Sequence, residues 1–244
     1  MFYVFCRADD LPALWAYRGL KQRGLAPLEI FTPEALVYNR RLEHRLQGDR
    51  AVTHLELVDG RVLDGDRVRG VINRLDYLPV EQFRSASPED QTYAAMEQQA
   101  IYLSWLSSLP GVMINPPGPR GLCGDVRSPA EWAWLATHAG LPVLPFHQDE
   151  HRSGDDYPVE GEPGISAEHW VVFDGEVYGD VDSSLIDTLR NAIRRLAIAC
   201  GLRLFGLTFS RTRTGDLRFR SASVLPDLNL GGEALLDALM AALA

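Results

Sequence analysis

The sequence predicts an α/β protein with two lobes. Short apolar runs alternate with helical patterns over residues 1–146, which is typical of a doubly wound parallel sheet. Residues 147–169 are rich in Asp, Glu, Gly and Pro and show no apolar period, so they predict an acidic connector. Residues 170–244 contain two hairpin patterns and two helical patterns, which predict a C-terminal α+β lobe.

The elements of the first lobe are apolar runs bounded by capping and turn residues. The predicted strands are residues 3–6, 28–31, 68–73, 112–115 and 141–146, with a hairpin at 54–62 around Asp59-Gly60. The predicted helices are residues 10–24, a helix beginning at Thr32-Pro33, 87–108 and 128–140. In the third of these helices one face carries apolar residues at helical spacing, so we expect it to be buried. These residues are Tyr93, Met96, Ala100 and Leu103.

The same signals define the second lobe. Asp174-Gly175 between two apolar runs predicts a hairpin over 170–178. The pattern Ser184-x-x-Asp187 predicts the start of a helix that ends at Gly201. The residues expected to face inward from this helix are Leu185, Leu189, Ile193 and Leu196. The remaining elements are strands at 204–209 and 217–221 and a last helix at 233–243.

Charge and composition exclude several classes of partner. The formal net charge is −9 and the sequence pI is about 5.1, so a nucleic-acid partner, which requires a basic face, is not expected. No apolar run approaches the roughly 18 residues of a membrane span, and the N-terminus has no signal-peptide pattern. Cys6, Cys123 and Cys200 are scattered without a CxxC pair, which is typical of reduced thiols. We therefore expect a cytoplasmic protein without a membrane partner.

Three arginines follow predicted strands of the parallel sheet. They are Arg7, Arg74 and Arg120. Because the carboxyl ends of parallel strands meet at one edge, we expect their guanidinium groups to converge on an anion. The alternative is that each arginine pairs with one of the 33 acidic residues of the chain.

Neighbouring residues would complete this anion site. Asn73 and Asn115 end two of the same strands and would supply neutral hydrogen bonds at its floor. The glycine-containing loop 118–124 leads to Arg127 and to a predicted helix N-terminus at Ser128. Backbone N–H groups of such a loop favour an anion, although the loop matches no established phosphate-binding pattern.

His147, Glu150 and His151 form an HxxEH pattern, the inverted zinc-peptidase signature. The signature needs a helix of at least two turns, which places the two imidazoles one turn apart. A proline precedes the pattern here, and Gly154 and Pro158 follow it. We therefore favour a solvated acidic loop over a zinc site and predict no bound metal.

Cys123 is the thiol with the most suggestive surroundings. It lies in a glycine loop ahead of a helix N-terminus, with Arg120 and Arg127 close in sequence, and such a setting lowers a thiol pKa. The alternative is a small buried hydrophobe, which is the commoner role of a free cysteine and the one we favour.

The order strand, helix, strand, followed by Asn115-Pro116, a capped helix and Gly140-Leu141-Pro142, resembles the start of ATP-grasp ligases. The resemblance is to the glutathione-synthetase-like, carboxylate–amine type. The stretch LRLFGLTFSRTRTGDLRFRSASVLPDL looks like the metal-binding hairpin of that family. The resemblance covers residues 1–146 and 170–244, and it implies a pre-ATP-grasp-like first lobe and an ATP-grasp-like second lobe.

The chain departs from this family where ATP and metal are held. The family carries a lysine strand and a glycine-rich lid in its central segment, whereas the connector 147–169 has no lysine. The family's metal ligands would fall at Thr208, Ser221 and Ser223. Mg²⁺ is normally held by carboxylates and substrate phosphates, which neutral hydroxyls cannot replace. The resemblance therefore implies a degenerate, truncated member without the central lid, in which ATP and Mg²⁺ binding is weak or absent.

These observations predict an accessory protein that is not itself a catalyst. We expect it to bind a small anionic metabolite or a peptide carboxylate beside a catalytic partner protein, in a biosynthetic or peptide-modification setting implied by the resemblance alone. The alternative is an ATP-dependent ligase that takes metal ligands from a partner or uses residues such as Asp216 and Asp227. A remoter alternative is a zinc hydrolase acting through the HxxEH segment.

Overall fold

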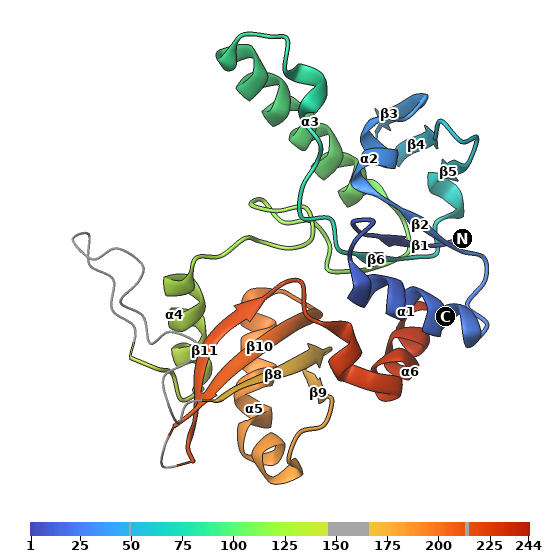
Figure 1. The fold of residues 1–244 in the computed structure, drawn as a ribbon. Coiled ribbons are helices and arrows are strands. Elements are labelled where there is room, and N and C mark those ends of the chain that lie inside the picture. The colour runs from blue at the N-terminus through green and yellow to red at the C-terminus, as the bar shows by residue number, and fades with distance from the viewer. Residues whose placement is uncertain (49, 146–165, 213–214) are drawn as a thin grey trace. The chain divides into compact units, whose positions relative to one another are not determined.

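A computed structural model describes residues 1–48, 50–145, 166–212 and 215–244 (Figure 1). The chain forms two compact units, Met1–Asp125 with Leu236–Ala244, and Val126–Leu235. Helix α4 (Pro129–Ala139) belongs to the second unit because its buried face joins the core of that unit. The division into 1–146, 147–169 and 170–244 places this helix in the first lobe and stays a prediction.

The first unit is built on a parallel sheet, as the sequence predicted. Its strands are β1 (Phe2–Phe5), β2 (Leu28–Phe31), β6 (Gly70–Asn73) and β7 (Val112–Ile114), in the order β2-β1-β6-β7. Its helices are α1 (Leu11–Gln22), α2 (Pro33–Val37) and α3 (Pro88–Ser108). Short 3₁₀ turns lie before β6 at Gly65–Arg67 and before α3 at Glu81–Phe83.

A small antiparallel sheet adjoins this core. It consists of β3 (Arg41–Gln47), β4 (Arg50–Glu56) and β5 (Val62–Asp64), in that order. The predicted hairpin at Asp59-Gly60 is confirmed, and Gly60 has the positive φ of 86° that the turn requires. Strand β3 was not predicted, because its sequence RLEHRLQ places few apolar side chains on either face.

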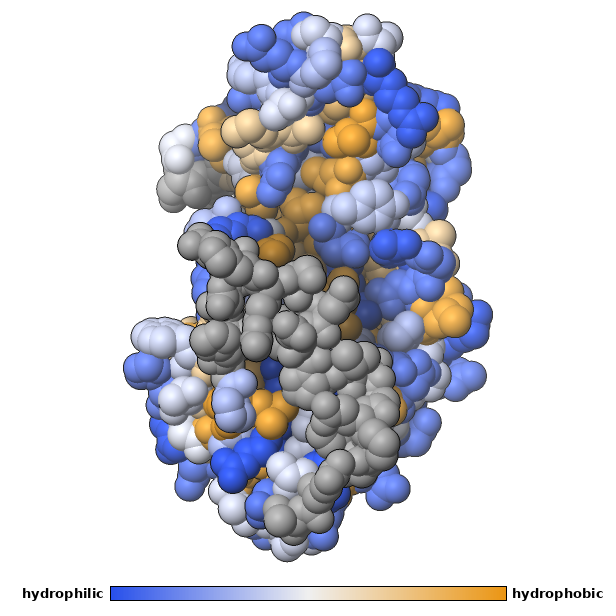
Figure 2. Space-filling view, turned by 60° about the vertical axis from the view of Figure 1, so that its left-hand side comes forward, coloured by the Kyte–Doolittle hydropathy of each residue, from blue (hydrophilic) through white to orange (hydrophobic). Residues whose placement is uncertain are grey.

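The buried face predicted for α3 is wrong. Tyr93 and Met96 are 65% and 66% exposed, and the buried residues are Tyr102, Trp105 and Leu106. Figure 1 shows the reason, since the first half of α3 extends away from the parallel sheet and only its last turns reach the core. Figure 2 accordingly shows apolar side chains at the surface in the upper part of the molecule, where α3 lies.

The second unit holds an antiparallel sheet in the order β11-β10-β8-β9. Its strands are β8 (Ser166–Phe173), β9 (Glu176–Tyr178), β10 (Leu204–Arg211) and β11 (Leu217–Ser223). Its helices are α4 and α5 (Ser183–Cys200), with a 3₁₀ turn at Leu228–Gly231, and α6 (Gly232–Leu243) begins in this unit and ends in the first. No described helix has the length and apolar character needed to cross a membrane.

Several local predictions in this part of the chain need correction. The helix α5 is capped by Asp182, whose side chain accepts from the N–H of Ser184, so Ser184 is not the cap. Residues 141–145 of the predicted strand at 141–146 form only a single parallel bridge, from Val143 to β11. Residues 166–169 of the predicted connector are strand in β8, and residues 146–165 lie outside the described part of the chain.

The capping box of α4 is confirmed, with Ser128 and Glu131 satisfying each other's backbone N–H groups.

Helices α4 and α5 cover one face of the second sheet. Its aromatic core residues are Trp170, Phe205, Phe209 and Phe219. From α5, the predicted inward residues Leu189, Ile193 and Leu196 join this core, and Leu185 packs against it. The opposite face of the sheet carries the polar residues described below.

This packing gives a test within one helix. Ile193→Ala should lower the free energy of unfolding by about 2–5 kcal/mol, because a fully buried side chain leaves a cavity. Ile198→Ala is the matched control, since Ile198 is 81% exposed and its loss should change stability by less than about 0.5 kcal/mol. Urea denaturation of both variants measures the difference, and equal losses would contradict the placement of α5.

Candidate functional site

Arg74 forms a buried ion pair at the carboxyl edge of the parallel sheet. Its Nε lies 2.7 Å from Oδ2 of Asp10 and its second terminal nitrogen lies 3.1 Å from Oδ1. The Arg74 side chain is only 3% exposed. Asp10 also caps α1 by accepting from the N–H of Ala13 at 3.0 Å. One carboxylate therefore joins the end of β6 to the start of α1, and both groups of the pair are satisfied within the protein.

Arg7 lies at the same edge and has its own carboxylate partner. It donates two hydrogen bonds of 2.9 Å to Asp9 and lies 4.0 Å from Asp76. The hydrogen bonds from Arg7 lower the pKa of Asp9, so this carboxylate stays ionised to lower pH. The guanidinium also lies over the ring of Tyr77 at 5.5 Å, and the pair is half-exposed.

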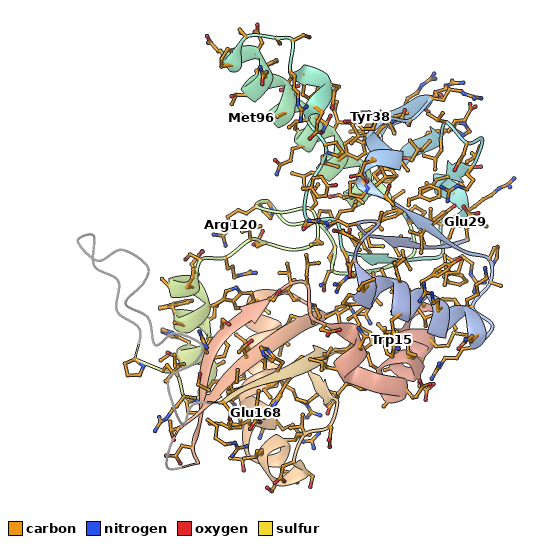
Figure 3. The ribbon with its side chains drawn as sticks, in the orientation of Figure 1. Trp15, Glu29, Tyr38, Met96, Arg120 and Glu168 are labelled. Atoms are coloured by element: carbon orange, nitrogen blue, oxygen red, sulfur yellow. The ribbon has the colours of Figure 1, made fainter. Side chains whose placement is uncertain are left out.

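Arg120 is on the loop after β7, where Figure 3 labels it. Its guanidinium lies 3.9 Å from the carboxylate of Asp125, whose Oδ1 also accepts from the Arg120 N–H at 3.2 Å. Arg127 lies in the second unit, donates to the carbonyl of Cys200 at 2.9 Å and stacks over Trp132.

The three arginines expected to share an anion therefore each have a carboxylate partner in the structure. Arg7 pairs with Asp9, Arg74 with Asp10 and Arg120 with Asp125, which is the alternative that the sequence left open. Arg127 belongs to a different unit from these three. Whether any of the four contacts a ligand stays a prediction.

Asn73 and Asn115 are buried, and Asn73 fixes the loop that follows Asn115 by hydrogen bonds to its backbone. The amide of Asn73 donates to the carbonyls of Asn115 at 3.0 Å and Leu122 at 2.7 Å, and its oxygen accepts from the N–H of Leu75. Asn115 is fully buried and has a positive φ of 57°, which asparagine tolerates better than most residues. These contacts hold the loop against the sheet.

The lowered thiol pKa considered for Cys123 is wrong. Burial, with a further contribution from Asp76, raises the pKa of Cys123 to about 12. Cys6, Cys123 and Cys200 are all buried free thiols, so the role as small hydrophobes is confirmed.

The face of the second sheet opposite α4 and α5 is its open face. It brings together the three positions where the resemblance placed metal ligands. Thr208 pairs with Ser221, but the next pair is Phe209 with Phe219, so β11 contains a bulge with one extra residue. Side chains alternate along a strand, and the bulge therefore moves Ser221 onto the same face as Thr208. Ser223, which pairs with Gly206, lies on that face as well.

A pocket of about 390 Å³ lies beside these residues. His169 on β8 pairs with Thr208, with Nδ1 of the ring 3.2 Å from the hydroxyl oxygen. The pocket has apolar walls, and its polar groups are His169, Thr208, Ser223 and Asp227. The remaining lining residues are Trp170, Val171, Gly206, Leu207, Leu225, Pro226 and Leu230. Among the described residues, neither lysine nor arginine lines it.

The residues of this face do not fit a magnesium ion. Hydroxyls occupy all three expected ligand positions, whereas Mg²⁺ takes carboxylates together with substrate phosphates. Asp227 lines the pocket, but its Oδ1 accepts from both nitrogens of Asn229, and Asp216 is not among the lining residues. No cluster of three His, Cys, Asp or Glu residues suited to a metal occurs in the described ranges. His147, Glu150 and His151 lie outside them.

The carboxyl edge of the first sheet yields a paired test of charge burial. Asp10→Asn keeps the helix cap but removes the carboxylate from a buried ion pair with Arg74, so the free energy of unfolding should fall by about 3–5 kcal/mol. Asp9→Asn breaks the exposed pair with Arg7 and should cost about 0–1 kcal/mol. Chemical denaturation at neutral pH distinguishes the two, and a small loss in Asp10→Asn would contradict the burial of this pair.

Comparison with known proteins supports only the fold directly. No protein-family model matches the sequence, and no curated protein is similar to it at a significant level. Among solved structures, the macrocyclase MdnC from Microcystis aeruginosa MRC, bound with its precursor peptide MdnA, has a TM-score of 0.67 at 8% identity. The alignment covers 98% of this chain and 100% of that one.

Two further solved structures are similar to this chain in fold. The ATP-grasp ligase PsnB, complexed with a minimal precursor, Mg and ADP, has a TM-score of 0.65 at 17% identity, covering 98% of this chain and 97% of that one. A RiPP-associated ATP-grasp ligase from Chryseobacterium gregarium, in complex with ADP and a leader and core peptide, has a TM-score of 0.65 at 11% identity, covering 99% and 96%. The predicted resemblance is confirmed at the level of architecture: this chain has the fold of the ATP-grasp ligases.

Proposed function

We propose that this protein binds a peptide as an accessory component of a peptide-modification system and does not itself carry out Mg-ATP-dependent ligation. The observation that carries the proposal is the open face of the second sheet, where Thr208, Ser221 and Ser223 stand at the positions expected to hold metal. Peptide binding is supported by the structural neighbours, several of which were solved with precursor peptides.

The chemistry of the pocket argues against ATP. Phosphoryl transfer depends on cations that neutralise the charge spread over the phosphate oxygens. The described walls of the pocket beside Thr208 offer hydroxyls, one imidazole and the carboxylate of Asp227, and include no lysine or arginine. A triphosphate would therefore meet a neutral or negative surface in an apolar setting, where an uncompensated charge is costly.

The first unit favours a peptide over a small anion as the ligand. Arg7, Arg74 and Arg120 already have carboxylate partners, so binding a free anion would require breaking an existing ion pair. A peptide can instead use backbone hydrogen bonds and apolar contacts, which need no free cation. Any covalent change to that peptide would then be made by a separate catalytic partner, which we include in the proposal.

The nucleotide part of the proposal has a direct test. Wild-type protein titrated with ATP and Mg²⁺ in a calorimeter should show no binding tighter than the millimolar range, because the site lacks metal carboxylates. The triple variant Thr208→Asp, Ser221→Glu, Ser223→Asn should bind Mn²⁺ at least about tenfold tighter than wild type, measured by electron paramagnetic resonance. Micromolar Mg-ATP affinity in the wild type would overturn the proposal and favour the ligase alternative.

The peptide part is tested separately with a displayed library of random peptides. Selection on the full chain should enrich a common pattern, and the synthetic peptide of that pattern should bind in solution by fluorescence anisotropy. Failure to enrich any peptide would contradict the peptide-binding role while leaving the nucleotide result unaffected.

A further inference from the structure

Strand β8 has an outer edge that the sheet does not use. Its neighbour β9 pairs only with the last residues of β8, from Val171 to Phe173. Residues 166–170 pair with β10 on one side, and no described strand lies on their other side. This edge contains Ser, Ala, Glu, His and Trp, without the proline or lysine that commonly protects an exposed edge.

The backbone geometry shows which groups point outward from this edge. The N–H of Asp174 donates to the carbonyl of Arg203 at 2.8 Å, so the backbone of Asp174 faces the β10 side. Backbone groups alternate between the two sides along a strand. The N–H and C=O groups of Ala167 and His169 therefore point to the unused side, in line with those of Val171 that face β9.

Two pockets flank this edge and share His169 and Trp170 in their walls. The first is the apolar pocket of about 390 Å³ on the open face, next to Thr208. The second has a volume of about 360 Å³ and lies beside Glu168 and the start of α5. Glu168 and Trp170 alternate with His169, so the second pocket meets the other face of the strand. Figure 3 labels Glu168 at this place.

The second pocket is acidic. Its described acidic lining residues are Glu168, Asp180 and Asp182, and Arg211 is the basic residue among those described. Arg211 is already bonded to Glu168, with Nε 2.7 Å from the carboxylate. Hydrogen bonds from Ser184 lower the pKa of Asp182, which keeps this carboxylate ionised. Asp180 and Asp182 thus give the pocket an excess of negative charge.

We propose that the outer edge of β8 takes up an extended peptide segment as an added strand. The segment alternates apolar and basic residues, with an apolar side chain in the pocket beside Thr208 and a lysine or arginine in the pocket beside Asp180. Alternate side chains of an added strand point to opposite faces of the sheet, which matches the two pockets flanking His169. This inference rests on the proposed peptide-binding function and specifies its site and the chemistry of the ligand.

The test uses the full chain and a fluorescein-labelled peptide of alternating valine and arginine, about the length of an average strand (~6 residues). Ala167→Pro removes one outward N–H, and proline is tolerated on a strand edge. Ala167→Val is the matched control, because it keeps that N–H and suits a strand. We expect anisotropy to show about tenfold weaker binding in Ala167→Pro and about twofold change or less in Ala167→Val.

A second pair of measurements tests the acidic pocket without touching the edge. Asp180→Asn with Asp182→Asn removes charge but keeps a capping side chain on α5, so the fold is retained. This double variant should bind the valine–arginine peptide about tenfold more weakly and a valine–glutamine peptide as wild type does. Thermal unfolding of each variant confirms that it is folded.

The outcomes separate this inference from the proposed function. Equal binding by Ala167→Pro and Ala167→Val, or equal binding of a peptide with its valines and arginines in two blocks, would overturn the edge site. If peptides selected from a library bind the wild type, and neither Ala167→Pro nor the double variant of Asp180 and Asp182 weakens that binding, the peptide-binding role stands and this site is wrong. No binding of the alternating peptide also overturns the inference.

Discussion

One extra residue in β11 decides which side chains reach the open face of the second sheet. Because strand residues alternate between faces, a bulge reverses the direction of every side chain that follows it. Ser221 and Ser223 therefore lie beside Thr208, whereas Phe219 before the bulge packs in the core. Without the bulge two hydroxyls would be buried, so the hydrophobic core and the polar face depend on the same irregularity of the backbone.

The two units handle charge in different ways. In the first unit the arginines at the sheet edge are balanced by adjacent aspartates, as in the buried pair of Arg74 and Asp10. In the second unit Asp180 and Asp182 stand beside the outer edge of β8, and Arg211, the one arginine among the described residues of that pocket, is hydrogen-bonded to Glu168. The net charge of −9 adds a long-range attraction for basic partners, which raises their rate of encounter at low salt.

The sequence predicted the elements whose signals are local. Apolar runs located β1, β2 and β6, and the residues Ser128, Gly140 and Gly201 located helix ends, because caps and turns are decided within a few residues. The face of α3 was wrong because helical spacing cannot show how far a helix extends beyond its sheet. Tyr93 and Met96 have the right period, but both side chains are exposed.

The candidate site was predictable only in part for the same reason. The positions of Thr208, Ser221 and Ser223 could be assigned by resemblance, but their shared face depends on a bulge that the sequence does not signal. The ion pair of Arg74 with Asp10 joins residues distant in sequence, so nothing local distinguished it from a free arginine. The free edge of β8 likewise follows from the shortness of β9, which is a property of the folded sheet.

The path of α6 has a consequence for the order in which the protein is made. The first unit is completed by Leu236–Ala244, and Leu236 approaches Gly19 of α1 so closely that an added Cβ there would lie 2.4 Å from a methyl group. The whole of Val126–Leu235 must therefore be synthesised before the last residues of the first unit can pack against α1. The second unit can fold while the first still exposes apolar surface, and a nascent chain halted before α6 would be a natural client for chaperones.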